Sequence, residues 1–231
     1  MRMLNVSEIF GPTMQGEGTN IGKLCYFVRL SGCDSNCRWC DTNSIKTVFT
    51  MPVSKIVLRL KQQAAESHIK HIVITGGNPL LQPNTRKLCQ KLLSNHFTVE
   101  IETQGTIYMD LPSDVHLNIS PKGPSAGNVD TMKTGAHFMK LIESHSHDLK
   151  FVLDGGEEDL AFMQGILEIE QHLCSKDNLK RIIIQPVNGM HEVNVTIYRK
   201  IIEQAIALNL KENYKSRVRT LTQLHKIAGV E

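Results

Sequence analysis

The stretch GCDSNCRWCDT (residues 32–42) places three cysteines within eight residues, next to the only tryptophan of the chain. Cys33, Cys37 and Cys40 follow the spacing C-x3-C-x2-C. Thiols this close together in a sequence are typical of a shared metal centre. A structural zinc site normally takes four ligands, whereas this loop supplies three, so the fourth position needs an explanation.

The remainder of the chain supplies no fourth ligand at a spacing typical of zinc. No second C-x2-C pair and no H-x3-5-H pair is present. His145 and His147 lie in a polar stretch, ESHSHD, which we expect to be a surface turn. Cys25, Cys89 and Cys174 lie in apolar patterns, and we expect them to be small core residues. A [4Fe–4S] cluster fits three thiolates better, because its fourth iron stays open for a small molecule.

Composition favours one globular domain, residues 1–231, with 41% apolar and 21% charged residues. The net charge of +3 and the absence of a basic–aromatic stripe do not favour a direct nucleic-acid binder. The N-terminus lacks the apolar core of a signal peptide, and no window reaches the length needed to cross a membrane. We therefore expect a cytoplasmic protein with reduced cysteines and no membrane partner.

Apolar, β-branched segments alternate with amphipathic helical patterns. The expected strands are residues 24–30, 71–75, 98–103, 115–120, 149–153 and 181–187, and the expected helices are residues 53–68, 84–96, 157–173 and 194–210. The strands show little strict alternation, which is typical of strands covered on both faces. The order predicts an α/β fold with a mostly parallel sheet of about six strands, either an open, partial barrel or a doubly wound sheet.

Polar clusters follow five of these expected strands directly. They are GCDSNCRWCDT, TGGNPL, TQG, SPKGP and QPVN. Because ligands of parallel α/β folds bind at the carboxyl ends of the strands, the five clusters are expected to form a single site.

The cysteine motif, placed after the first expected strand and with Trp39 before its last cysteine, resembles that of the radical S-adenosylmethionine (SAM) superfamily. The resemblance implies an open, partial β/α barrel and a [4Fe–4S] cluster on Cys33, Cys37 and Cys40. It also implies that SAM binds the open iron and is cleaved by one electron to a 5′-deoxyadenosyl radical. The superfamily's Gly-Gly-Glu-Pro turn reads Gly76-Gly77-Asn78-Pro79 here, so a neutral amide replaces the carboxylate. The two glycines are expected to let the backbone approach the ligand closely.

Residues 8–18 (EIFGPTMQGEG), 28–33 (VRLSGC), 39–42 (WCDT) and 223–226 (QLHK) resemble the 7-carboxy-7-deazaguanine synthase family. The resemblance implies a lyase of queuosine biosynthesis that converts 6-carboxy-5,6,7,8-tetrahydropterin to 7-carboxy-7-deazaguanine and ammonia, by hydrogen-atom abstraction and ring contraction. It also implies Mg²⁺ as a further cofactor, flavodoxin or ferredoxin as electron donor, and a homodimer.

The same resemblance implies roles for individual residues. Arg29 is expected to hold the substrate carboxylate with its forked guanidinium, and Gln15 to pair with an edge of the pterin through donor and acceptor together. The full expected set is Met14, Gln15, Gly16, Arg29 and Thr75 for substrate; Gly77, Ser120, Pro121, Lys122, Gln185, Pro186, Val187 and Asn188 for SAM; and Thr42 for Mg²⁺. Glu17 and Glu102 are weaker candidates.

Three other functions stay open at this point. A glycyl-radical activating enzyme would share the cysteine motif, but would not need residues 15–18 (QGEG) or 223–226 (QLHK). A homologue that binds cluster and SAM without turnover is a second possibility, because of Asn78. A zinc-bound module for RNA is a third, and it predicts zinc in the purified protein.

Overall fold

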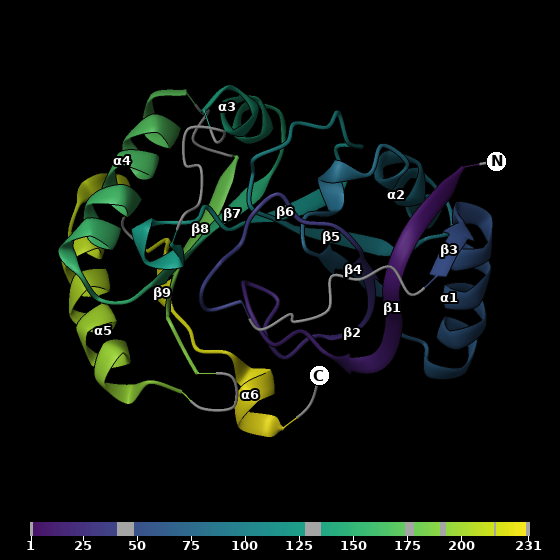
Figure 1. The fold of residues 1–231 in the computed structure, drawn as a ribbon, viewed down its shortest axis with the longest axis horizontal. Helices are drawn as coiled ribbons and strands as arrows, with labels where there is room; N and C mark the ends of the chain where they lie inside the picture. The colour runs from purple at the N-terminus through teal and green to yellow at the C-terminus, as the bar shows by residue number, and fades with distance from the viewer. Residues whose placement is uncertain are drawn as a thin grey trace.

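A computed structural model describes residues 2–40, 49–127, 135–173, 178–189, 193–214 and 216–229. A single nine-stranded sheet runs through these residues in the order β3-β1-β2-β4-β5-β6-β7-β8-β9. Every pair from β2 to β9 is parallel, whereas β1 is antiparallel to both β2 and β3. The sheet curves without closing, as an open, partial barrel does (Figure 1).

All six expected strands are present. They are β2 (Leu24–Leu30), β4 (His71–Gly76), β5 (Thr98–Thr103), β6 (Val115–Ile119), β7 (His147–Leu153) and β8 (Leu179–Pro186). Three more strands extend the sheet, namely β1 (Met3–Met14), β3 (Phe49–Pro52) and β9 (Val218–Thr220). The extra strands lack a continuous apolar run. β1 is interrupted by Gly11-Pro12 and by two register shifts, and the other two are at most four residues long.

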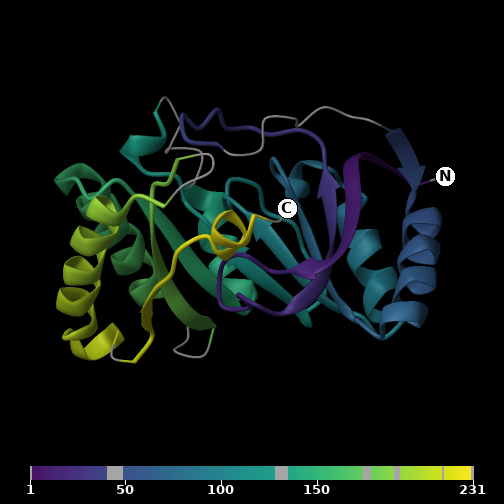
Figure 2. The same ribbon diagram turned by 90° about the horizontal axis from the view of Figure 1, so that it is seen from below.

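Helices cover the outer side of the curved sheet (Figures 1 and 2). The four expected ones are α1 (Val53–Ser67), α2 (Thr85–Leu93), α4 (Glu157–Leu173) and α5 (Val195–Asn209), and α3 (Gly135–Ser144) joins them. The short α6 (Leu224–Ala228) instead lies at the open, concave side, near the loop that joins β1 to β2 (Figure 2). No helix within the described ranges is both long and apolar enough to cross a membrane.

The two faces of the central strands differ in character. Val99 and Ile101 of β5 belong to the large core between sheet and helices, whereas Glu100 and Glu102 alternate with them along the strand. In β6, Leu117 likewise belongs to this core, whereas its neighbour Asn118 is a buried polar residue. Successive side chains of a strand point to opposite faces, so the concave face carries buried polar groups. Glu100 is 1% exposed and Ile101 0%, so these strands are covered on both faces, as expected, although the cover of the concave face is polar.

His145 and His147 do not form the expected surface turn. Their exposed fractions are 3% and 0%, and His147 is the first residue of β7. Burial lowers the pKa of His147 to about 4, and its Nδ1 lies 2.9 Å from the His145 carbonyl oxygen. Cys25 and Cys89 are core residues, as predicted, with 0% exposure each. Cys174 lies outside the described residues.

The glycine turn after β4 packs directly on the start of the cysteine loop. Gly76 has φ +144°, and a Cβ atom there would lie 1.9 Å from the Leu30 carbonyl oxygen. A Cβ atom on Gly77 would lie 2.3 Å from the Gly32 carbonyl oxygen and 2.4 Å from the Cβ atom of Cys33. The space that a side chain would need is therefore filled by the protein's own chain.

Gly77→Ala tests this packing. We expect the apo-protein to lose about 1–3 kcal/mol of unfolding free energy, because the new methyl group forces backbone apart. Gly165→Ala is the matched control: its Cβ atom would meet nothing within 4 Å. Placed in the interior of α4, it should stabilise by about 0.5–1 kcal/mol. Urea unfolding of both variants measures the difference, and equal stabilities would contradict the packing argument.

Candidate active site

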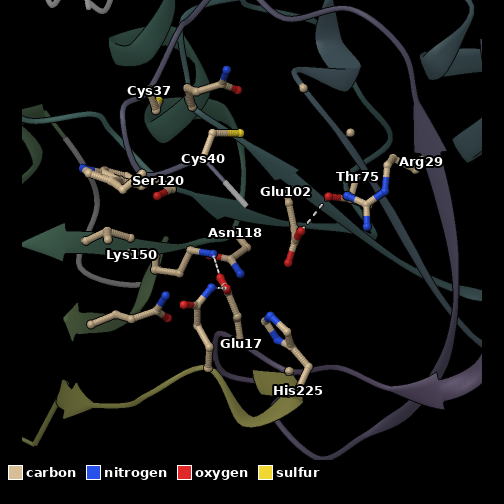
Figure 3. A pocket seen from close by; sticks show the side chains of 18 of the residues that line it. Glu17, Arg29, Cys37, Cys40, Thr75, Glu102, Asn118, Ser120, Lys150 and His225 are labelled. Atoms are coloured by element: carbon tan, nitrogen blue, oxygen red, sulfur yellow. Dashed lines mark hydrogen bonds and ion pairs between the residues drawn. The ribbon is translucent and has the colours of Figure 1, made fainter. Parts of the chain in front are cut away.

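A large cavity of about 1110 Å³ occupies the concave side of the sheet (Figure 3). It is lined by the cysteine loop after β2, by the carboxyl ends of strands β4 to β8, by the β1–β2 loop and by the C-terminal segment. The expected convergence of the five polar clusters on one site is thus confirmed. Pockets for one small molecule usually measure about 300–1,000 Å³, so this cavity has room for more than one ligand.

Cys33, Cys37 and Cys40 all line this cavity. Cys33 Sγ accepts hydrogen bonds from Gln104 Nε2 at 3.1 Å and from the Ser35 backbone N–H at 3.4 Å. Such donors stabilise thiolate sulfurs that ligate iron.

The arrangement of these thiols also fits a cluster. Burial raises the pKa of the Cys33 and Cys37 thiols, and the positive charge of Lys122 acts against this rise at Cys37. Within the described ranges, no three His, Cys, Asp or Glu side chains converge on one point as ligands of a single ion would. Three thiols on separate irons do not need to converge in that way. The donor set therefore fits a [4Fe–4S] cluster.

The Asn78 side chain hydrogen-bonds the cysteine loop at Asp34. It is fully buried and does not line the cavity. Its Nδ2 donates to Asp34 Oδ1 at 3.0 Å and to Thr106 Oγ1 at 2.9 Å, and its Oδ1 accepts from Thr103 Oγ1 at 3.0 Å. A carboxylate at this position could not donate to Asp34. The amide that departs from the superfamily pattern is therefore matched to the acidic residue beside Cys33.

Arg29 lies in the cavity wall, where its Nε donates to Glu8 Oε1. Its guanidinium also stands over the Phe10 ring, 5.6 Å from the centroid. Thr75, on the neighbouring strand, donates to Glu102 Oε2 at 2.7 Å. Arg29 is thus held in a fixed orientation within reach of a ligand in the cavity.

The side chain of Gln15 is committed to the protein. Nε2 donates to Glu100 Oε1 at 3.2 Å and to Glu102 Oε1 at 3.1 Å, and Oε1 accepts from the Glu17 backbone N–H at 3.2 Å. Only 2% of the residue is exposed. We expected Gln15 to pair with the substrate through both its amide nitrogen and its amide oxygen. In the structure both atoms already hydrogen-bond other protein groups. The visible role of Gln15 is to bridge two buried carboxylates.

Glu17 joins the β1–β2 loop to the C-terminal segment and to β7 (Figure 3). It forms an ion pair with Lys150 and accepts a hydrogen bond from Gln223 Nε2 at 2.5 Å. Burial alone would raise the pKa of Glu17, but Lys150, Gln223 and the nearby His225 outweigh it and lower that pKa to about 2. The Leu224 backbone N–H donates to the Gly16 carbonyl oxygen at 2.9 Å, so the tail is tied to the same loop.

Most of the expected site residues line the cavity. They are Met14, Gln15, Gly16, Arg29, Thr75, Gly77, Ser120, Lys122, Gln185, Asn188 and the three cysteines of the motif. Pro121, Pro186 and Val187 do not line it. Asn188 donates from Nδ2 to Gln223 Oε1 at 3.1 Å and so also supports the tail. Thr42 lies outside the described residues.

Several further cavity residues had been assigned no role of their own. They are Glu8, Phe10, Asn118, Lys150, Gln223 and His225. Two of these carried a usable signal: Lys150 and Asn118 are polar residues inside otherwise apolar strands, LKFVL and VHLNIS. A buried polar residue in such a strand needs a partner. Glu8, Gln223 and His225 lie in the segments 8–18 and 223–226 that resemble the family, but their individual contacts could not be predicted, because their partners are distant in sequence.

The Glu17–Lys150 pair predicts a specific acid response. Because the folded-state pKa of Glu17 is lowered from 4.5 to about 2, its contribution to stability is present above pH 4.5 and is lost as the pH falls toward 2. Glu17→Gln should cost about 3 kcal/mol at neutral pH, since Lys150 is left without its buried partner. Urea unfolding of the apo-protein should show this difference shrinking below pH 4.5.

Glu158→Gln, at an exposed position in the first turn of α4, is the matched control. It should track the wild type at every pH. A Glu17→Gln deficit that stays constant down to pH 2 would contradict the lowered pKa.

Comparison with known proteins agrees with this geometry. Residues 27–155, more than half of the chain, match the model of the Radical SAM superfamily. A 7-carboxy-7-deazaguanine synthase of Bacillus subtilis is 36% identical over 172 residues, which is 70% of this chain and 70% of that protein. The enzyme of that name from Methanospirillum hungatei is 31% identical over 231 residues, covering 98% of this chain and 86% of that protein.

The fold agrees with a solved structure as well. The crystal structure of QueE from Escherichia coli superposes with a TM-score of 0.73 at 23% identity, over 96% of this chain and 95% of that chain. The identities over most of the sequence, the superfamily match that spans the cysteine motif, and the thiol-lined cavity lead to one conclusion. The chain belongs to the 7-carboxy-7-deazaguanine synthase family of radical SAM enzymes, which use a [4Fe–4S] cluster and SAM.

Proposed function

We propose that this enzyme converts 6-carboxy-5,6,7,8-tetrahydropterin to 7-carboxy-7-deazaguanine and ammonia, as a single radical SAM domain spanning residues 1–231. The names of the relatives support the reaction. The observation that carries it is the cavity, which brings the three thiols of the cysteine loop together with Arg29 and with buried carboxylates. The family match disfavours a glycyl-radical activating enzyme and a zinc-bound module. A reducing cytoplasm suits the thiolate ligands.

The residues divide the cavity between cofactors and substrate. Cys33, Cys37 and Cys40 would hold the cluster, which, when it is bound together with SAM, supplies the one-electron chemistry for hydrogen-atom abstraction. Lys122 and Ser120 lie on the cysteine side: Lys122 Nζ donates to Ser120 Oγ at 3.0 Å and stands 5.2 Å from the Trp39 ring centroid. The positive charge of Lys122 supports the proposal that these two residues contact SAM, which carries a carboxylate.

The substrate end is defined by Arg29 and by acidic groups. A forked guanidinium held by Glu8 suits a planar carboxylate. Burial and the neighbouring carboxylates Glu17 and Glu100 raise the pKa of Glu102, against the charge of Lys150. A carboxyl group in such a setting can hold a proton and donate it to a ring atom of the substrate. Mg²⁺ bound by Thr42 is part of the proposal, because a hard oxygen ligand suits that ion.

The reaction is tested by an anaerobic assay. The protein, reconstituted with iron and sulfide, receives SAM, Mg²⁺, dithionite and the carboxylated tetrahydropterin, and products are followed by mass spectrometry. We expect 7-carboxy-7-deazaguanine without matching loss of SAM. Cys37→Ala should lose bound iron and all turnover, whereas Cys89→Ala, a substitution at a buried core thiol outside the cavity, should retain its iron.

Other outcomes of this assay are informative. SAM cleavage with an untouched pterin would refute the substrate, and a cluster-loaded protein without any turnover would identify an inactive homologue. Replacing dithionite by reduced flavodoxin or ferredoxin tests the proposed electron donor. That part is wrong if neither protein supports the turnover that dithionite supports.

We further propose that the enzyme is a homodimer. An exposed apolar stripe runs along helix α5 and its C-cap residue: Val195, Ile202, Ile206 and Leu210 have exposed fractions of 57%, 37%, 58% and 81%. Their spacing places them along one helix face. A stripe of this kind on a surface helix supports self-association.

Charged residues introduced into the α5 stripe should prevent dimer formation. Ile206→Glu combined with Leu210→Glu is expected to leave a monomer in light scattering, because the carboxylates would lose water at the interface. Leu58→Glu, at an isolated position on α1 that is 55% exposed, should keep the wild-type mass. A wild-type protein that is monomeric at tens of micromolar would refute the proposal.

A further inference from the structure

Asn118, on β6, carries a buried amide without a partner. The residue is 1% exposed, and neither Nδ2 nor Oδ1 has a hydrogen-bond partner within the part of the chain that the structure describes. Burial of a polar amide without hydrogen bonds is costly, so native proteins almost always satisfy such groups. Asn118 lines the active-site cavity, which indicates that the missing partner is a ligand.

The loop between β1 and β2 packs closely against the Asn118 amide. Gly18, in the loop between β1 and β2, has φ +70°, and a Cβ atom there would lie 2.5 Å from Asn118 Nδ2. A glycine at this position is therefore the residue that fits beside the amide. Lys150 and Glu17, which lie nearby in the cavity, are engaged with each other (Figure 3).

Most other side-chain amides of the cavity hydrogen-bond protein groups. Gln15 bridges Glu100 and Glu102, and Gln104 donates to Cys33 Sγ. Asn188 and Gln223 hydrogen-bond each other. Gln185 resembles Asn118 in part, since its Oε1 has no partner among the described residues. Asn118 thus offers a complete donor–acceptor pair, the role that the sequence suggested for Gln15.

The register of the sheet places this pair at the substrate end. Asn118 is directly opposite Glu102 on β5, whose carboxylate accepts from Thr75. Asn118 lies two residues before Ser120, and Ser120 is the residue on the cysteine side of the cavity. With about 3.3 Å per residue along a strand, the amide lies about 7 Å deeper in the barrel than Ser120.

We propose that Asn118 recognises the pyrimidinone half of the pterin, with Oδ1 accepting from a ring N–H and Nδ2 donating to the adjacent carbonyl oxygen. The inference rests on the proposed function and names a specificity residue for it. Adenine, as in SAM, presents a similar donor–acceptor edge, but the depth of Asn118 and its level with Glu102 favour the pterin. A site built to pair with both groups rejects ligands that lack them.

The experiment measures two affinities on the reconstituted full-length enzyme. One is for 6-carboxypterin, a fluorescent analogue that keeps the pyrimidinone ring, by anisotropy in the presence of SAM. The other is for SAM itself, by equilibrium dialysis. Asn118→Leu and Asn118→Asp should each weaken 6-carboxypterin about tenfold or more, because the amide donor is lost, and should leave the SAM affinity unchanged. Gln185→Leu is the matched control and should weaken SAM instead.

The outcomes distinguish a failure of the proposed function from a failure of the proposed role of Asn118. A wild type that does not bind 6-carboxypterin refutes the proposed function and this inference together. A wild type that binds it while both Asn118 variants bind equally well overturns the inference alone. A loss of SAM affinity in the Asn118 variants would assign the amide to the adenine and also overturn it. Since Asn118→Asp keeps the side-chain size, it decides the question if Asn118→Leu fails to fold by circular dichroism.

Discussion

The packing of the turn after β4 against the loop after β2 is the constraint on which the site depends. The two strands are parallel neighbours, so both end at the same edge of the sheet. Gly76 and Gly77 let the turn touch the backbone of the loop, and Asn78 N–H donates to the Gly32 carbonyl oxygen at 2.9 Å. The Asn78 side chain then holds Asp34, beside the first cysteine. These contacts position the start of the cysteine loop, from Gly32 to Asp34.

The opposite wall of the cavity is built from the two ends of the chain. The β1–β2 loop meets the C-terminal segment where Gly16 leaves no room for a side chain, since a Cβ atom there would lie 2.1 Å from His225 Nδ1. The Glu17–Lys150 pair and Gln223 lock this contact. Burying two charges costs desolvation energy, and good hydrogen-bond geometry offsets it only when both partners stay in place. The position of this wall therefore depends on contacts among the β1–β2 loop, the C-terminal segment and β7.

Charge is divided across the cavity in a way that suits its two ligands. Thiols, Lys122 and Ser120 lie at the rim formed by the strand ends, whereas Glu100, Glu102 and their partners lie deeper in the barrel. Cations near the rim favour an anionic cofactor and deep carboxylates favour the N–H groups of a heterocycle. Arg29, held by Glu8, is the exception at the substrate end, and it matches the one carboxylate of the proposed substrate.

Local pattern alone determined the α/β alternation, the six central strands, the four long helices and the cysteine loop, because hydrophobic periodicity and ligand spacing are short-range properties. The same pattern located the five clusters at one rim. It could not locate β1, β3 and β9, which lack a continuous apolar run: β1 is interrupted by two register shifts, and the other two strands are at most four residues long. It also misjudged His145 and His147, which are buried, and it could not show that the Gln15 amide is bound to other protein groups while the Asn118 amide has no partner among the described residues. Which polar side chain is satisfied and which is left open depends on neighbours from distant strands, so only the tertiary structure decided it.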